Sequence, residues 1–207
     1  MLFNASPPVV VIMSAISFIF HTYESKGGIW LVLEKLSKYI ALKIKQSDPE
    51  GPTSVEIMEY ELGVRLNLIA TILLTVIFAL FTGRLTESLI ALIGFAVSRR
   101  FSGGWHMRSL TTCAFVSSVL FTLIPFIMLN KSITLIITLL SILLFAILAP
   151  NDFIEVNPSK LDPYLKVISV LIVSSNLFIM SDVLGLAFFA QAMLLISWGE
   201  VISWVKG

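Results

Sequence analysis

The chain has 207 residues, of which 57% are hydrophobic and only 13% are charged, and its mean hydropathy is +0.96. A soluble domain of this length could not bury so much apolar side chain, so the composition excludes a soluble fold and predicts a membrane protein. The 14 basic and 13 acidic residues leave a net charge of +1, which gives no field that would attract nucleic acid.

Residues 1–28 are expected to be an N-terminal extension of uncertain role. They contain an apolar run at residues 9–20 that is short for a membrane span. No basic residue precedes this run and no small-residue cleavage site follows it, so it does not have the pattern of a signal peptide. Whether it spans the membrane or lies on it is left open.

Residues 29–46 are predicted to form an amphipathic helix. Apolar residues recur there at three- and four-residue steps, opposite a charged face that includes Glu34 and Lys38. Lysines beside that face favour a helix in the plane of an anionic membrane surface, with anionic lipid as a partner. The alternative is a helix that packs on the bundle and turns its polar face to water.

Six apolar segments follow a turn-rich connector at residues 47–53. They are residues 62–81, 85–97, 110–129, 133–149, 165–180 and 183–202. Most approach the length of about 20 residues that a spanning helix needs, and the second is short. The expected fold class is therefore all-α: a polytopic membrane helix bundle of about six membrane segments with an amphipathic N-terminal helix. Residues 29–207 would form a single membrane-embedded domain.

The distribution of lysine and arginine predicts the orientation of this bundle. If residues 62–81 run outward, only Arg84 and Lys131 of the 14 basic residues lie outside. This bias requires that residues 85–97 cross the membrane. The protein is then expected to be a multi-pass protein of the cell membrane, with the loop of residues 98–108 on the cytoplasmic side.

That loop begins the stretch RRFSGGWHMRSLTTC, residues 99–113, which is the densest in reactive side chains and ends at the single cysteine. One cysteine excludes an internal disulfide, and with two histidines it supplies too few zinc ligands, so we expect no metal and no cofactor. A lone cysteine is commonly packing material. A single cysteine in a chain with two histidines is also the pattern expected of a catalytic nucleophile.

Thiol catalysis needs a thiolate, a base to generate it and donors for the oxyanion. Ser109 is a plausible N-cap for a helix that begins at Leu110, which would place Cys113 in the first turns. Free backbone N–H groups and the helix dipole favour an anion there. His106 would be the base.

The spacing of these two residues sets a geometric condition. A regular helix would separate His106 from Cys113 by about 10 Å along its axis, whereas a direct hydrogen bond needs about 3 to 3.5 Å. The backbone between Gly103 and Ser109 must therefore leave helical geometry. Gly103 and Gly104 allow that bend, because glycine accepts backbone angles that other residues resist.

Several motifs together are similar to those of one known family. The motifs are Arg99-Arg100, Gly103-Gly104, His106 with Cys113 seven residues later, Glu59-Tyr60-Glu61, and Ala149-Pro150. In these the chain resembles the AgrB family, membrane cysteine endopeptidases that process quorum-sensing propeptides in Gram-positive bacteria. The resemblance covers roughly residue 31 to the C-terminus. One departure is that the loop after Pro150 has fewer basic residues than is typical of the family.

The resemblance implies that Cys113 attacks a bond of a membrane-associated propeptide and that His106 transfers the proton. An internal thiol or hydroxyl of the acylated peptide would then close a thiolactone or lactone ring. The resemblance also implies a homodimer. Weaker candidates for binding or positioning the substrate are Arg99, Arg100, Gly103, Gly104, Arg108 and Ser109. Anchoring at the cytoplasmic surface explains the three arginines without any substrate.

Two other classes of function are compatible with the composition. A non-enzymatic small transporter or permease component is the main alternative. Such a protein should carry charged or broken helices at the middle of the membrane, whereas the centres of the predicted spans are nearly free of charge. A scaffold or immunity-type binding protein with the same fold is also left open.

Overall fold

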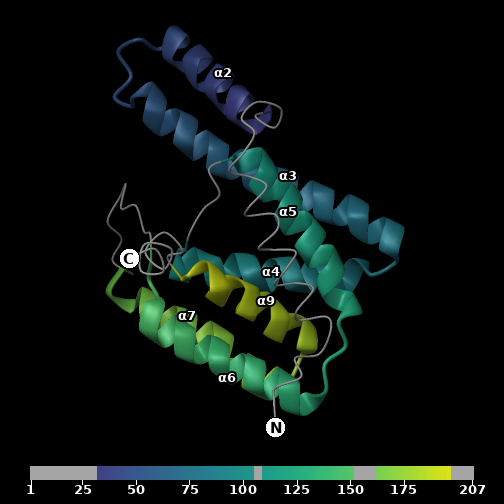
Figure 1. Ribbon diagram of the computed structural model, residues 1–207. Coiled ribbons are helices and arrows are strands. Elements are labelled where there is room, and N and C mark those ends of the chain that lie inside the picture. The colour runs from purple at the N-terminus through teal and green to yellow at the C-terminus, as the bar shows by residue number, and fades with distance from the viewer. Residues whose placement is uncertain (1–31, 105–108, 152–161, 197–207) are drawn as a thin grey trace, which may run out of the picture.

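The computed structural model describes residues 32–104, 109–151 and 162–196, and their secondary structure is helical apart from one isolated bridge (Figure 1). The elements are α2 (Val32–Ser47), α3 (Val55–Thr82), α4 (Leu85–Ser102), α5 (Leu110–Leu123), η1 (Ile124–Phe126), α6 (Lys131–Leu148), η2 (Asp162–Tyr164), α7 (Leu165–Ser174), α8 (Asn176–Ile179) and α9 (Asp182–Leu194). The all-α prediction is confirmed, and each of the six predicted apolar segments contains a described helix. The predicted extension at residues 1–28 lies outside the described residues.

Short polar side chains begin several of these helices. The side chains of Ser54, Asn130 and Ser181 accept hydrogen bonds from backbone N–H groups in the first turns of α3, α6 and α9. Such caps satisfy donors that the helix itself cannot pair. At its other end, α3 stops at Gly83, whose φ of 69° is left-handed and suits glycine.

Helices α3 and α6 bury mainly small and hydroxyl residues and expose many of their large apolar ones. In α6, Thr134, Thr138 and Ser141 are buried, whereas its exposed residues include Leu139 and Leu143. Similarly, the buried residues of α3 are Gly63, Thr71, Thr75 and Ala79. Small and hydroxyl residues between helices, with apolar residues outside, are typical of helices surrounded by lipid rather than water. The side-chain distribution therefore agrees with the composition.

Two described helices, Val55–Thr82 and Lys131–Leu148, are long and apolar enough to cross a membrane. The apolar stretches 110–126, 165–179 and 182–194 are shorter. Helix α4 is as long as α6, but it has a glutamate in its first turn and two arginines in its last. A bundle of six crossings, and the orientation of that bundle, stay predictions.

Helix α4 lies between two groups of helices, α2, α3 and α5 on one side and α6, α7 and α9 on the other (Figure 1). Its residues Ala91, Leu92 and Phe95 form a core with parts of α5, η1 and α9. Phe95 and Phe121 of α5 stack there with ring centroids 5.0 Å apart. The middle of α4 is therefore packed between helices, and the helix leads directly to the segment with the predicted site.

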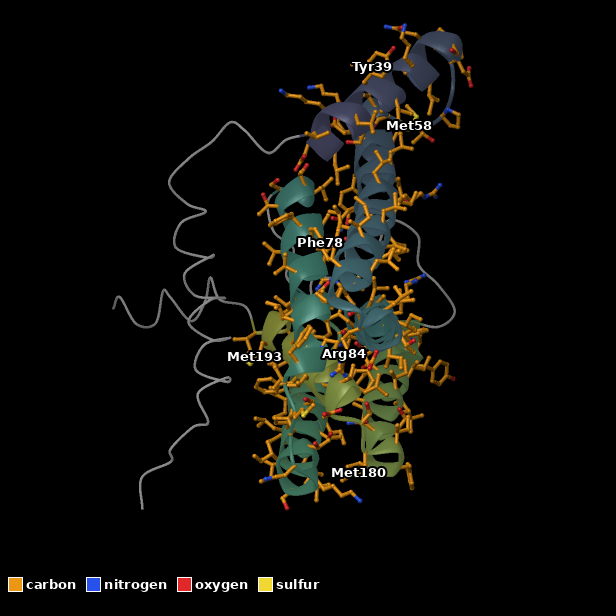
Figure 2. The ribbon with its side chains drawn as sticks, turned by 90° about the vertical axis from the view of Figure 1, so that its right-hand side faces the viewer. Tyr39, Met58, Phe78, Arg84, Met180 and Met193 are labelled. Carbon is orange, nitrogen blue, oxygen red and sulfur yellow. The ribbon has the colours of Figure 1, made fainter. Side chains whose placement is uncertain are left out.

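Helix α2 packs along the first half of α3, and both project beyond the remaining helices, as Tyr39 and Met58 show in Figure 2. Its buried residues are Ser37 and Ala41, while Leu36 and Leu42 are exposed. Small residues of α2 face α3: a Cβ on Gly63 of α3 would lie 3.7 Å from the Ser37 hydroxyl, which is an ordinary contact distance. The helix thus packs on the bundle, the alternative noted above, and contact with lipid stays a prediction.

Candidate functional site

Cys113 lies in the first turn of α5, as the predicted N-cap requires. The Ser109 hydroxyl accepts from the Thr112 N–H at 3.2 Å, and the Cys113 N–H donates to the Ser109 carbonyl at 3.0 Å. Ser109 itself is buried and has extended backbone angles, whereas Cys113 is half-buried. The predicted cap at Ser109 is confirmed, and the thiol stands at one end of the bundle.

Glu34 of α2 occupies the start of this helix. Its carboxylate accepts from the Thr111 hydroxyl at 2.8 Å and from the Thr111 N–H at 3.4 Å. The Leu33 N–H also donates to the Thr111 hydroxyl, at 3.0 Å. The N–H groups of Thr111 and Thr112 therefore already have acceptors within the protein and are not free to bind an anion. We call Glu34, Ser109 and Thr111 the cap anchor.

The environment of Glu34 favours its charged form. Partial burial acts to raise the pKa of Glu34, but four hydrogen bonds outweigh it, so the pKa is lowered from its ordinary value. The donors are the N–H groups of Glu34 and Thr111 and the hydroxyls of Thr111 and Ser109. A carboxylate at this position also interacts favourably with the positive end of the helix dipole.

The backbone bend predicted at Gly103-Gly104 is present. Helix α4 ends at Ser102, and the two glycines follow with φ of 70° and 119°. A Cβ on Gly104 would lie 3.1 Å from the Leu194 carbonyl oxygen and 3.2 Å from Gln191 Nε2. Both the backbone angle and the close approach therefore require glycine at residue 104.

Asn151, after the end of α6, fixes these glycines through the backbone. The Gly104 N–H donates to the Asn151 carbonyl at 2.8 Å, and the Asn151 N–H donates to the Ser102 carbonyl at 2.9 Å. The Asn151 side chain donates to the Leu195 carbonyl at 2.7 Å. A short parallel bridge thus joins the end of α4 to the end of α6. The Asn151 side chain adds the contact with the end of α9.

Gln191 of α9 holds the same turn through its side chain. Its Nε2 donates to the Gly103 carbonyl at 2.7 Å and to the Ser102 hydroxyl at 3.0 Å, and its Oε1 accepts from Arg99 Nη1 at 3.1 Å. We call Gly103, Gly104, Asn151 and Gln191 the glycine anchor. Sequence reasoning missed Gln191, although a strongly polar residue within an apolar helix was a signal that could have found it.

The two arginines of the predicted basic pair differ in position. Arg99 is half-buried, donates to the Gly104 carbonyl at 3.4 Å, and lies with its guanidinium 5.7 Å from the Phe95 ring centroid. Arg99 also interacts electrostatically with Cys113. Arg100 is exposed. Only Arg99 of the pair is therefore tied to the site.

The structure brings Arg99, Gly103 and Gly104 together, and it joins this group to Cys113 through the charge of Arg99. His106 and Arg108 lie outside the described residues, so the pairing of His106 with Cys113 stays a prediction. Within residues 32–104, 109–151 and 162–196, no group of three histidine, cysteine, aspartate or glutamate side chains could hold a metal ion.

Comparison with known proteins places this arrangement in context. The family described as Accessory gene regulator B, AgrB, matches residues 33–205. The chain is similar to "Protein FsrB" of Enterococcus faecalis (strain ATCC 47077 / OG1RF), with 29% identity over 94 residues. That alignment covers 45% of this chain and 38% of the relative, so the matched part is well under half of the relative's length. No solved structure matches significantly.

Proposed function

This chain belongs to the AgrB family, and we propose that it is a membrane cysteine endopeptidase that cleaves a quorum-sensing propeptide. The observation that supports the proposal best is the position of Cys113. The thiol lies in the first turn of a capped helix, in electrostatic interaction with Arg99, and only a few residues of sequence separate that helix from Gly103 and Gly104. A cation near the sulfur can stabilise the negative charge that develops when the sulfur attacks a carbonyl group.

In the proposed reaction, His106 accepts the thiol proton and the Cys113 sulfur attacks a peptide carbonyl carbon. The tetrahedral intermediate then collapses, the C–N bond breaks, and the leaving amine takes the proton from His106. The N-terminal part of the propeptide remains on Cys113 as a thioester. An internal thiol or hydroxyl of that peptide attacks the thioester, which closes a thiolactone or lactone ring and releases the Cys113 thiolate.

The hydrogen bonds of the cap anchor limit which groups can donate to the oxyanion of the tetrahedral intermediate. The N–H groups of Thr111 and Thr112 donate to Glu34 and Ser109, and the Cys113 N–H donates within the helix. The half-buried guanidinium of Arg99 is the described cation best placed to stabilise negative charge near the sulfur. We propose that Arg99, rather than the helix start, supplies this stabilisation.

Further parts of the proposal concern location and partners. The arginines of the last turn of α4 and the lysines of α2 support a site at the cytoplasmic face of the cell membrane. The exposed face of α2 carries Lys35, Lys38 and Lys43 next to Leu36 and Tyr39, which suits anionic lipid. The substrate is a membrane-associated propeptide, and the working state is a homodimer.

The test is processing of a cognate propeptide, measured in membranes that contain the full chain. Cys113→Ala and His106→Ala are each expected to abolish cleavage, because one removes the nucleophile and the other removes the base. Ser117→Ala, one turn further along α5, is the matched control and should retain processing. Full cleavage by the Cys113→Ala variant would overturn the proposed function.

A further inference from the structure

Gln191 carries a side-chain amide and lies near the end of α9, where the other buried residues of the helix are glycine or apolar residues. It is fully buried, in α9, where the neighbouring buried residues are Phe188, Ala192 and Leu195. A buried amide is costly unless each polar atom has a partner. Its retention at this position therefore points to the groups with which it forms hydrogen bonds.

The groups that form hydrogen bonds with the Gln191 side chain belong to the last turn of α4 and the glycine that follows it. The amide nitrogen donates to Gly103 and Ser102, and the amide oxygen accepts from Arg99. A planar amide that makes these bonds together fixes the Gly103 carbonyl relative to the Arg99 guanidinium. Only a side chain with both a donor and an acceptor can do so, because a carboxylate does not donate and an apolar side chain does neither.

Both of these partners lead to the proposed site. The chain that leaves Gly103 and Gly104 reaches His106 two residues later, and the Arg99 guanidinium interacts with Cys113. Helix α9 packs mainly on α4 and α6, so Gln191 acts on Cys113 through other residues and not by contact.

We propose that Gln191 is a positioning residue of the peptidase, which holds the turn at Ser102 and Gly103 and the Arg99 guanidinium in the arrangement that the site at Cys113 needs. This inference rests on the proposed function. It differs from a purely structural explanation, in which the amide only joins α9 to α4. On the structural explanation, loss of Gln191 lowers the amount of folded protein, and each folded molecule keeps its activity.

Asn176, just before the start of α9, provides a matched control for the Gln191 substitutions. Asn176 is also a fully buried amide, and it donates to the Thr138 hydroxyl and the Ser181 carbonyl and accepts from the Ser181 N–H. These bonds lie at the start of α9, and those of Gln191 lie near its end. Asn176→Leu therefore removes a comparable buried network that is remote from Cys113.

The experiment compares Gln191→Met, Gln191→Glu and Asn176→Leu in the full-length protein in membranes, normalised to folded protein. Two quantities are measured: propeptide cleavage, as kcat and KM, and the rate of Cys113 alkylation by iodoacetamide across a pH series. Methionine has a similar length to glutamine and removes donor and acceptor without a large cavity. Glutamate keeps an acceptor for Arg99 and loses the donors to Gly103.

Gln191→Met is expected to lower kcat by about tenfold or more with little change in KM, because misplaced catalytic groups affect the chemical step. Its alkylation by iodoacetamide should become slower, because the Arg99 guanidinium is no longer held in place by the amide. Gln191→Glu should keep the alkylation profile and still lose cleavage. Asn176→Leu should keep both kcat and the alkylation profile per folded molecule.

Unchanged kcat per folded molecule in Gln191→Met would overturn the inference, as would an equal loss in Asn176→Leu or wild-type cleavage by Gln191→Glu. Should methionine prevent folding, the glutamate variant still decides between the two explanations. Cys113→Ala, measured in parallel, separates the two proposals. If it retains cleavage, the proposed function fails; if it abolishes cleavage while the Gln191 variants are normal, only the positioning role fails.

Discussion

The cap anchor and the glycine anchor hold the two sides of residues 105–108 by different chemistry. The glycine anchor consists of uncharged amides and backbone groups, and Gln191 within it is fully buried. The cap anchor depends on the carboxylate of Glu34, which comes from α2. The described residues on the two sides of 105–108 are thus tied to helices from opposite ends of the chain, one side by a buried amide and the other by a carboxylate.

The largest loss of propeptide cleavage is expected from a substitution at Gly104, where the glycine anchor leaves least room for a side chain. Gly104→Ala would place a Cβ 3.1 Å from the Leu194 carbonyl, at a φ of 119° that L side chains rarely adopt. We expect cleavage to fall by about 100-fold, because a displacement of about 1 Å at a catalytic group has an effect of that order. The measurement is propeptide cleavage per folded molecule.

Gly83→Ala is the control for Gly104→Ala. It imposes a similar left-handed strain at a φ of 69°, but nothing lies within 4 Å of its Cβ. This variant should lose some stability and keep its activity. Equal activity of the two alanine variants would show that the glycine anchor does not position the site.

A smaller effect is expected from removing the charge that joins the glycine anchor to the thiol. Arg99→Met should lower cleavage by about tenfold or more, because it removes the cation proposed to stabilise the negative charge that develops in the transition state. Arg100→Met is the matched control, since Arg100 is exposed, and an equal loss in both variants would contradict the distinction between them.

The smallest effect is expected at the cap anchor. Glu34→Gln keeps an acceptor for Thr111 and loses the charge, so it should destabilise the contact between α2 and α5 by ~1 kcal/mol, after allowance for solvent screening. We expect a few-fold loss of cleavage. Glu50→Gln, at an exposed position in the connector before α3, is the control and should be neutral.

The same residue gives the cap anchor a pH dependence. Because the pKa of Glu34 is lowered from 4.5 in the folded protein, its stabilisation is fully present above pH 4.5 and is lost as the pH falls through the lowered value. Glu34→Gln should abolish this acid-side loss in thermal unfolding measured over a pH series. An unchanged acid-side loss in the variant would exclude Glu34 as its source.

Local features of the site were predictable from the sequence, and long-range ones were not. Ser109 as a cap and Gly103-Gly104 as a bend depend on neighbours within a few residues, so residue type alone indicates them. Glu34 and Gln191 contact residues 77 and 92 positions away, respectively. Those contacts depend on how α2 and α9 pack, which hydrophobic periodicity does not specify.

Helix α2 shows the same limit in the fold. The periodicity of its apolar residues predicts a helix correctly, but it suggests that the leucine and isoleucine side chains are the packed ones. Ser37 and Ala41 are buried instead, and Ser37 lies in contact distance of Gly63 on α3. Between helices in a membrane protein, apolar residues do not identify the buried face, since lipid accepts them equally well.

The central claim, that Cys113 forms an acyl-enzyme, is tested most directly by mass spectrometry of the protein after reaction with a propeptide that lacks its ring-closing thiol or hydroxyl. Without that nucleophile the acyl-enzyme should accumulate. The account predicts that the peptide containing Cys113 gains the mass of the N-terminal propeptide fragment and that hydroxylamine releases it. Cleavage of the propeptide with no adduct on Cys113 would contradict the account.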